Sequence, residues 1–351
     1  MAKIDTLFKM MKQQGASDLH LSSGTPPIFR LSGEMEKLNS PALTHEQVKA
    51  LLFEILTDAQ KAQIEGEKDL DFAYELAGVA RFRGNVLYTY RGIAAVFRII
   101  PSEILTADQL NLPEGVRKMT EFKKGLVLVT GPTGSGKSTT LAAMIDLINS
   151  TRREHILTLE DPLEFIHPNK LSLLNQREIG AHSMSFKNAL KAALREDPDV
   201  ILVGEMRDLE TISLAMTAAE TGHLVFGTLH TNSAPKTIDR IIDVFPKDAQ
   251  EQVRTLLGES LKGVVCQQLL KKVGGGRVAA MEILLGNSAV SNLIREGKTF
   301  QIPSIMQTAK REGMQLMDQH LKDLIAAGLV KGEDAYRCAI NKKDFESYLN
   351  K

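Results

Sequence analysis

The stretch GLVLVTGPTGSGKSTT, residues 125–140, decides the fold. It opens with an apolar run that has the length and composition of a buried β-strand, and from Lys137 onward its pattern is typical of a helix. Between them, Gly131 to Ser138 fits the pattern GxxxxGK[ST]. A strand before the motif and a helix after it indicate a phosphate-binding loop (P-loop) rather than an ordinary glycine-rich turn.

The residues of this loop have predicted roles in binding ATP. Backbone N–H groups near Gly134 and Gly136 would surround phosphate oxygens at the positive N-terminus of the following helix. Lys137 would reach the β- and γ-phosphates, and the hydroxyl of Ser138 would be a ligand of Mg²⁺. The residues expected to bind ATP are Gly131, Thr133, Gly134, Ser135, Gly136, Lys137, Ser138 and Thr139, with Ser138 as the metal ligand.

Buried strands alternate with helical patterns after the P-loop. The apolar runs HILTLED (155–161), VILVGE (200–205) and LVFGTLH (224–230) are separated by segments of helical period. This alternation predicts an α/β fold with a parallel sheet covered on both faces. Ligands of such sheets bind at the carboxyl ends of the strands, so we expect the ends of these runs to lie near the P-loop.

Three titratable side chains end these strands. Glu205 follows Gly204, which stands where many P-loop enzymes have aspartate, so Glu205 is expected to orient the attacking water or to act on Mg²⁺ through a water. Glu160 is expected to meet it at the same edge, although either could be an exposed strand-end carboxylate. His230 would donate a hydrogen bond toward the γ-phosphate. His223 precedes its strand and should lie at the opposite edge, where a structural role is favoured.

The region before the P-loop reads as a separate small domain. Residues 1–100 combine a short helix at about 3–14, a helix that Thr44 can cap, and alternating residues over 69–100 that predict an antiparallel meander. Residues 101–113 contain two prolines and little periodicity, so we interpret them as an interdomain linker and hinge.

The remaining residues, 114–351, would form the catalytic domain. After the parallel strands, CQQLLKKVGGGRVAAMEILL (266–285) indicates a hairpin turned by glycines. From about 288 to 351 the pattern is charged and helical, with an apolar stripe on one face. This predicts a C-terminal helical region.

Composition excludes several classes of protein. The chain of 351 residues is 43% hydrophobic and 25% charged, which is typical of globular proteins, and it contains no run near the roughly 18 apolar residues of a membrane helix. The N-terminus lacks the apolar core of a signal peptide, so we expect a cytoplasmic protein. Two cysteines without a CxxC cannot form a zinc site. Equal numbers of acidic and basic residues, 43 each, give no electrostatic reason to expect nucleic acid as partner.

Four stretches, GPTGSGKS, LTLEDPLEF, ILVGEMRD and TGHLVFGTLHTNSA, are similar in sequence and order to the Walker A, Asp box, Walker B and His box of the secretion ATPases of type II and type IV pilus systems. The resemblance covers nearly the whole chain. It implies a RecA-like P-loop core with a smaller, PAS-like N-terminal α+β domain, and a homohexamer that hydrolyses Mg-ATP between subunits. Arg83 and Arg98 match the family's trans-acting arginines; otherwise they would be solvated arginines of the meander. The expected catalytic residues are Glu205, Glu160, His230, Arg83 and Arg98.

Within that family, the chain is most similar to PilT-type pilus retraction ATPases. Extension and type II secretion ATPases usually carry a tetracysteine zinc loop after the equivalent of CQQLLKK, where this chain has Cys266 alone. AVSNLIRE (289–296) is similar to the retraction motif AIRNLIRE and departs from it at Val290 and Ser291. The resemblance implies pilin disassembly and twitching motility. It also implies that the protein lies at the inner face of the cytoplasmic membrane. There it would be bound to an inner-membrane platform protein and the pilus machinery, without a membrane-spanning segment of its own.

Other functions stay open at this point. The same fold serves pilus extension and type II secretion. A nucleic-acid-dependent RecA-like motor is disfavoured because the chain has no tryptophan, only 5% aromatic residues and no net charge. A regulatory module that binds a nucleotide without hydrolysing it is a further alternative. Replacement of Glu205 separates the two, because only an enzyme has a turnover that this replacement can abolish.

Overall fold

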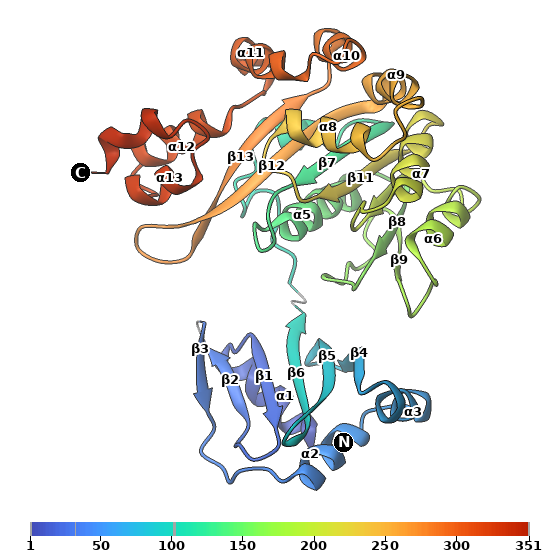
Figure 1. Cartoon of the computed structure of the whole chain (residues 1–351), viewed down its shortest axis with the longest axis vertical. Coiled ribbons are helices and arrows are strands. Elements are labelled where there is room, and N and C mark those ends of the chain that lie inside the picture. The colour runs from blue at the N-terminus through green and yellow to red at the C-terminus, as the bar shows by residue number, and fades with distance from the viewer. Residues whose placement is uncertain (1, 32, 101–102, 350–351) are drawn as a thin grey trace. The chain divides into compact units, whose positions relative to one another are not determined.

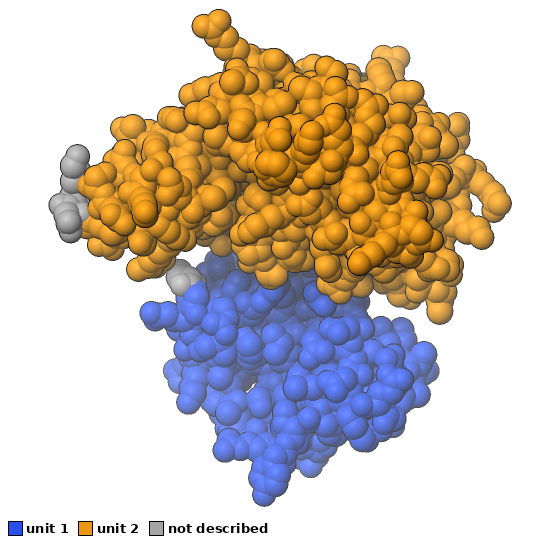
Figure 2. Space-filling view, turned by 45° about the horizontal axis from the view of Figure 1, so that its top comes forward, with its two compact units in different colours: residues 1–103 blue, residues 104–351 orange. Residues whose placement is uncertain are grey.

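The computed structural model describes residues 2–31, 33–100 and 103–349, and the chain divides into two compact units (Figures 1 and 2). Unit 1 is Met1–Glu103 and unit 2 is Ile104–Lys351. Within the described ranges, no helix has both the length and the apolar character needed to cross a membrane.

Unit 1 is a six-stranded antiparallel sheet with helices packed on one face. The strand order is β3-β2-β1-β6-β5-β4. The strands are β1 (Asp18–Ser22), β2 (Ile28–Leu31), β3 (Glu34–Lys37), β4 (Asp69–Leu76), β5 (Ala80–Thr89) and β6 (Gly92–Ile100), and the helices are α1 (Ile4–Gln14), α2 (His45–Phe53) and α3 (Asp58–Glu67). Phe8 of α1 stacks on Phe82 of β5 with ring centroids 4.2 Å apart, so this face of the sheet forms the core.

The local sequence accounts for most of these elements. Thr44 caps α2 as expected, because its hydroxyl accepts from the backbone of Gln47 while the Gln47 side chain accepts from the backbone of Thr44. Sequence patterns did not reveal β3 or α3. All four residues of β3 are exposed, and α3 contributes only Ile64 to the core, so neither element has an apolar period to detect.

Unit 2 contains a seven-stranded sheet of order β13-β12-β7-β11-β10-β8-β9, parallel except that β13 pairs antiparallel with β12. Figure 1 shows the long β12–β13 hairpin at one side of this sheet. The strands are β7 (Gly125–Thr130), β8 (His155–Glu160), β9 (Leu173–Glu178), β10 (Val200–Val203), β11 (Leu224–Leu229), β12 (Leu261–Lys271) and β13 (Arg277–Leu285).

The helices of unit 2 precede, separate and follow its strands along the chain. They are α4 (Glu114–Met119), α5 (Lys137–Thr151), α6 (Phe186–Ala193), α7 (Leu209–Glu220), α8 (Ala234–Asp243), α9 (Gln250–Ser260), α10 (Ser288–Arg295), α11 (Ile302–Thr308), α12 (Met317–Ala326) and α13 (Gly332–Cys338), with short 3-10 helices η1 (Thr299–Gln301), η2 (Lys310–Glu312) and η3 (Lys342–Tyr348). The predicted C-terminal helical region is therefore made of several short helices.

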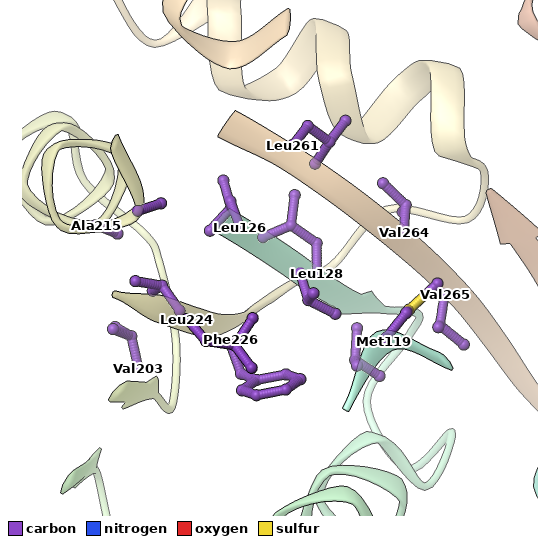
Figure 3. Packing of buried hydrophobic residues seen from close by; sticks show 14 of the residues in the cluster. Met119, Leu126, Leu128, Val203, Ala215, Leu224, Phe226, Leu261, Val264 and Val265 are labelled. Atoms are coloured by element: carbon purple, nitrogen blue, oxygen red, sulfur yellow. The ribbon is translucent and has the colours of Figure 1, made fainter. Parts of the chain in front are cut away.

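The core of unit 2 lies on both faces of the sheet. Every residue of β7, β10 and β11 is buried, and because successive residues of a strand point to opposite faces, both faces must be covered. Figure 3 shows Leu128, Phe226 and Val265, from three strands of this sheet, within the buried cluster. The predicted α/β fold with a smaller N-terminal α+β domain is confirmed.

The sequence predicts a linker over 101–113, and the boundary between the two units falls inside this segment, between Glu103 and Ile104. Its first two residues lie outside the described part of the chain. Further along, Ala107 and Leu112 are buried in the core of unit 2. The guanidinium of Arg117 donates to both of their carbonyls, at 2.8 and 2.9 Å. Residues 106–112 therefore belong to unit 2, which corrects the C-terminal limit of the expected linker.

Candidate active site

The P-loop joins β7 to α5 as its sequence indicates. Gly131, Gly134 and Gly136 have φ angles of 144°, 78° and 86°, a region in which residues with a Cβ are strained. The ammonium of Lys137 lies against the loop, because its Nζ donates to the carbonyl of Gly131 at 2.8 Å and to that of Pro132 at 3.2 Å. The loop thus has the backbone form and the cation that an anion site requires.

Three predicted residues are positioned along the sheet edge that carries the P-loop. β7, β11, β10 and β8 are consecutive neighbours in the sheet, and at their carboxyl ends lie the P-loop, His230, Glu205 and Glu160. Burial lowers the pKa of Lys137, while the negative charges of Glu205 and Glu164 act in the opposite direction. The sheet therefore assembles basic, acidic and hydrogen-bonding groups at one edge.

Glu205 is held by two partners. Its Oε1 lies 2.6 Å from Nε of Arg207 and 3.0 Å from Nε2 of His230. The hydrogen bond from Arg207 lowers the pKa of Glu205 most; partial burial opposes this shift, and His230 adds a smaller lowering. Glu205 is therefore ionised at neutral pH, in the form that can accept a hydrogen bond from water.

Glu160 is in a different environment from Glu205. Its Oε1 accepts from the Thr158 hydroxyl at 2.6 Å and from Nε2 of Gln176 at 3.3 Å. Enclosure by the protein nevertheless raises its pKa, because removal from water penalises the charged carboxylate. Two carboxylates at adjacent strand ends thus have pKa values shifted in opposite directions, which suits them to different tasks.

Gly204, where many P-loop enzymes have aspartate, is tightly packed against the end of β8. A Cβ added at Gly204 would lie 3.1 Å from the carbonyl oxygen of Leu159 and 3.2 Å from Cα of Glu160. A side chain at this position would therefore require the ends of β8 and β10 to shift by a few tenths of an ångström. Glu205 is the carboxylate that follows Gly204 at this edge.

The sequence did not predict three side chains that contact Glu205 and Glu160. Arg207 follows Glu205 by two positions in the sequence, and this spacing was a usable signal for their ion pair. Thr158 precedes Glu160 by two positions in β8, so both lie on one face of the strand. Gln176 stands opposite Thr158 in β9, a strand that the sequence pattern did not reveal.

Arg83 and Arg98 lie in unit 1. They stand directly opposite each other on β5 and β6, and therefore share a face of the sheet. Nε of Arg98 donates to Oδ1 of the buried Asp18 at 2.8 Å, whereas the Arg98 side chain remains 71% exposed. The result is an exposed pair of guanidinium groups, one of them oriented by a buried carboxylate.

Ser291, one of the two departures from the motif AIRNLIRE, contacts a neighbouring helix. Helix α10 carries this stretch, with Val290 and Ile294 buried against the core. The hydroxyl of Ser291 donates to the carbonyl of Gly258 in α9 at 2.5 Å, and a Cβ on Gly258 would lie 3.1 Å from the carbonyl of Ser291. Two small residues thus allow a close crossing of α9 and α10.

The donors near the P-loop fit a magnesium ion that arrives with phosphates. Over the described part of the chain, no cluster of three or more His, Cys, Asp or Glu side chains could hold a metal by itself. Ser138 lies half-buried in the first turn of α5, directly after Lys137, where its hydroxyl could serve as a magnesium ligand. Mg²⁺ typically keeps few protein ligands and takes the rest from phosphates and water.

Comparisons with known proteins agree with this geometry. A family model described as Type II/IV secretion system protein matches residues 2–275. The type IV pilus retractation ATPase PilT of Pseudomonas aeruginosa is 55% identical over 332 residues, which cover 95% of this chain and 96% of that protein. A twitching motility protein of Neisseria gonorrhoeae is 56% identical over 318 residues, 90% of this chain and 85% of that protein. The crystal structure of the pilus retraction motor PilT with bound ADP matches with a TM-score of 0.93 at 48% identity, covering 99% of both chains.

Proposed function

We infer that this chain, which belongs to the type II/IV secretion system protein family, is an ATPase that powers the retraction of type IV pili. The observation that carries the enzymatic assignment is the pairing of Glu205 with His230 beside the P-loop at one sheet edge. The assignment to pilus retraction rests on the similarity to PilT over almost the full length of both proteins.

The P-loop binds the phosphates of ATP. Backbone N–H groups at the start of α5 and the ammonium of Lys137 receive the negative charge, and Ser138 would hold Mg²⁺. When bound, this ion neutralises charge on the β- and γ-phosphates. The low pKa of Glu205 keeps it as a carboxylate that orients the attacking water.

His230 acts as the contact between the carboxylate and the γ-phosphate. Its Nε2 is 3.0 Å from Glu205, and its side chain is 44% exposed at the sheet edge. A bound γ-phosphate offers a second acceptor for this ring, so the hydrogen bond of His230 differs between the ATP state and the state after hydrolysis. Glu160, with its raised pKa, supports the same edge as a group that is more easily protonated.

A neighbouring subunit completes the ATP site of each chain. We place Arg83 and Arg98 against the γ-phosphate of the adjacent chain in a homohexamer, where guanidinium groups stabilise the charge of the transition state. Loss of the γ-phosphate then releases this contact and lets the units of neighbouring chains separate. The motor works at the cytoplasmic face of the inner membrane, on a platform protein of the pilus base.

Deletion of the gene in its source organism tests this function. Loss of a retraction motor is expected to give cells with excess surface pili and without twitching motility, and the wild-type gene should restore both properties. Cells that lose their pili would instead identify an extension motor. Unchanged pili and motility would contradict a role in pilus movement.

A further inference from the structure

A buried amide contacts both the P-loop and the helix that follows it. Gln267 lies in β12, its side chain is 2% exposed, and it belongs to neither the P-loop nor the strand-end residues described above. Nε2 of Gln267 donates to the carbonyl of Ser135 at 2.8 Å, and its Oε1 accepts from the hydroxyl of Thr140 at 2.7 Å. One side chain thus joins the tip of the loop to the first turns of α5.

The chemistry of the partners fixes the orientation of this amide. A carbonyl oxygen only accepts, so the NH₂ group of Gln267 must face Ser135, and the Thr140 hydroxyl must then donate to Oε1. Ser135 and Thr140 are themselves 3% and 2% exposed, so water does not replace either bond. Both halves of the amide are used, and removal of the amide leaves two buried polar groups without partners.

The bond to Ser135 sets the direction of the next N–H group. In a planar trans peptide, the carbonyl of one residue and the N–H of the following residue point to opposite sides. Because the carbonyl of Ser135 faces Gln267 of β12, the N–H of Gly136 points away from β12. Gln267 therefore determines which side of this peptide is presented to a phosphate.

The backbone of β12 approaches the same loop. A Cβ at Gly131 would lie 2.2 Å from the carbonyl oxygen of Gln267, so only glycine fits there. The hydroxyl of Thr130, the last residue of β7, donates to Sγ of the buried Cys266 at 3.1 Å. The neighbouring residues Cys266 and Gln267 thus contact both the entry to the P-loop and its tip.

We propose that Gln267 is a positioning residue for the nucleotide, which acts through Ser135 and Thr140 to hold the P-loop in its anion-binding form. This role deepens the proposed function and rests on residues 131–138 being the nucleotide site. Without the amide, the loop samples other conformations, and binding must first restore the competent one. Nucleotide affinity should fall although no atom that touches the nucleotide has changed.

The test compares Gln267→Met with Gln268→Met in the full chain. Methionine keeps the length of the side chain and removes both hydrogen bonds. Gln268 is the matched control, since it lies next in the strand and its amide donates instead to the carbonyl of Cys338, at 3.4 Å. Loss of the buried bonds is expected to raise the Kd for Mg-ADP about tenfold. The KM for ATP should rise while kcat changes less, and Gln268→Met should match the wild type.

Melting curves with and without Mg-ADP separate positioning from a merely structural role. Loss of two buried hydrogen bonds is expected to lower the melting temperature of Gln267→Met without nucleotide, whereas positioning predicts in addition that this variant gains less than the wild type on adding Mg-ADP. Equal Kd values for Gln267→Met and the wild type would overturn the proposal, whatever the melting temperature. Should Gln267→Met fail to fold, Thr140→Val, which removes one of the two bonds, must still weaken Mg-ADP binding. A wild-type chain that binds no nucleotide would contradict the proposed function itself.

Discussion

Glu205 and His230 follow the carboxyl ends of two adjacent parallel strands, β10 and β11, and their side chains meet, with Oε1 of Glu205 3.0 Å from Nε2 of His230. The register of the sheet produces this contact, because Val203 stands opposite Gly227 and both strands finish at the same edge. The contact joins the residue expected to orient water to the residue expected to detect the γ-phosphate. Its disruption should affect turnover more than folding.

His230→Ala is expected to lower kcat for ATP about tenfold or more, because a preorganised donor beside the developing charge is lost. The matched control is His223→Ala. His223 precedes the same strand, and its Nδ1 lies 2.9 Å from the carbonyl of Ala218 at the end of α7, away from the P-loop. Steady-state ATPase assays of both variants check this. Equal losses in the two variants would show that the effect is structural.

His167 should make the stability of unit 2 depend on pH. Burial lowers its pKa from 6.5 to about 4; Asp146 opposes this shift and Lys170 adds to it. The unfolded chain takes up this proton at a higher pH than the folded chain does, so protonation of His167 favours unfolding. The resulting loss of stability is absent above about pH 6.5 and grows as the pH falls toward 4. Its full size is on the order of 3 kcal/mol.

Urea unfolding between pH 7 and pH 4 measures this effect. His167→Gln, which cannot take up a proton in this range, should lose less stability than the wild type as the pH falls. Parallel pH profiles for the two proteins would mean that His167 is not the group responsible.

Gly204→Ala tests the close approach of β8 and β10. The added methyl would press on the carbonyl of Leu159 and on Cα of Glu160, which are backbone atoms that cannot move aside cheaply. Overpacking of this kind is expected to cost about 1–3 kcal/mol and to reduce ATPase activity by displacing Glu160 and Glu205. Gly66→Ala in α3 is the control, since its methyl meets open space and should raise stability by up to about 1 kcal/mol. Thermal unfolding and ATPase assays distinguish the two.

Ser291→Ala tests the crossing of α9 and α10. Removal of the hydroxyl that donates to Gly258 is expected to cost about 1 kcal/mol of unfolding free energy. Ser288→Ala, at an exposed position of the same helix, should change stability by less than about 0.5 kcal/mol. Chemical denaturation measures both. If the two variants were equally stable, the bond to Gly258 would contribute nothing to the crossing.

The sequence allowed the fold and part of the site to be predicted for identifiable reasons. Strands such as β7 and β11 are continuous apolar runs, and their carboxyl ends directly indicate which residues share an edge. The strand β9 was missed because its burial is mixed and polar residues such as Gln176 interrupt it. Gln176 and Gln267 act through contacts between distant elements, and periodicity within one segment carries no information about such contacts.

The central claim is that the residues at this sheet edge hydrolyse ATP. The rate of ATP hydrolysis by the Glu205→Gln variant tests this claim most directly. The substitution keeps the shape of the side chain and removes the charge that the Arg207 hydrogen bond favours. Mg-ADP affinity should stay close to that of the wild type, while the rate of ATP hydrolysis by the full-length chain should fall about a hundredfold or more. Hydrolysis by Glu205→Gln at the wild-type rate would contradict the claim.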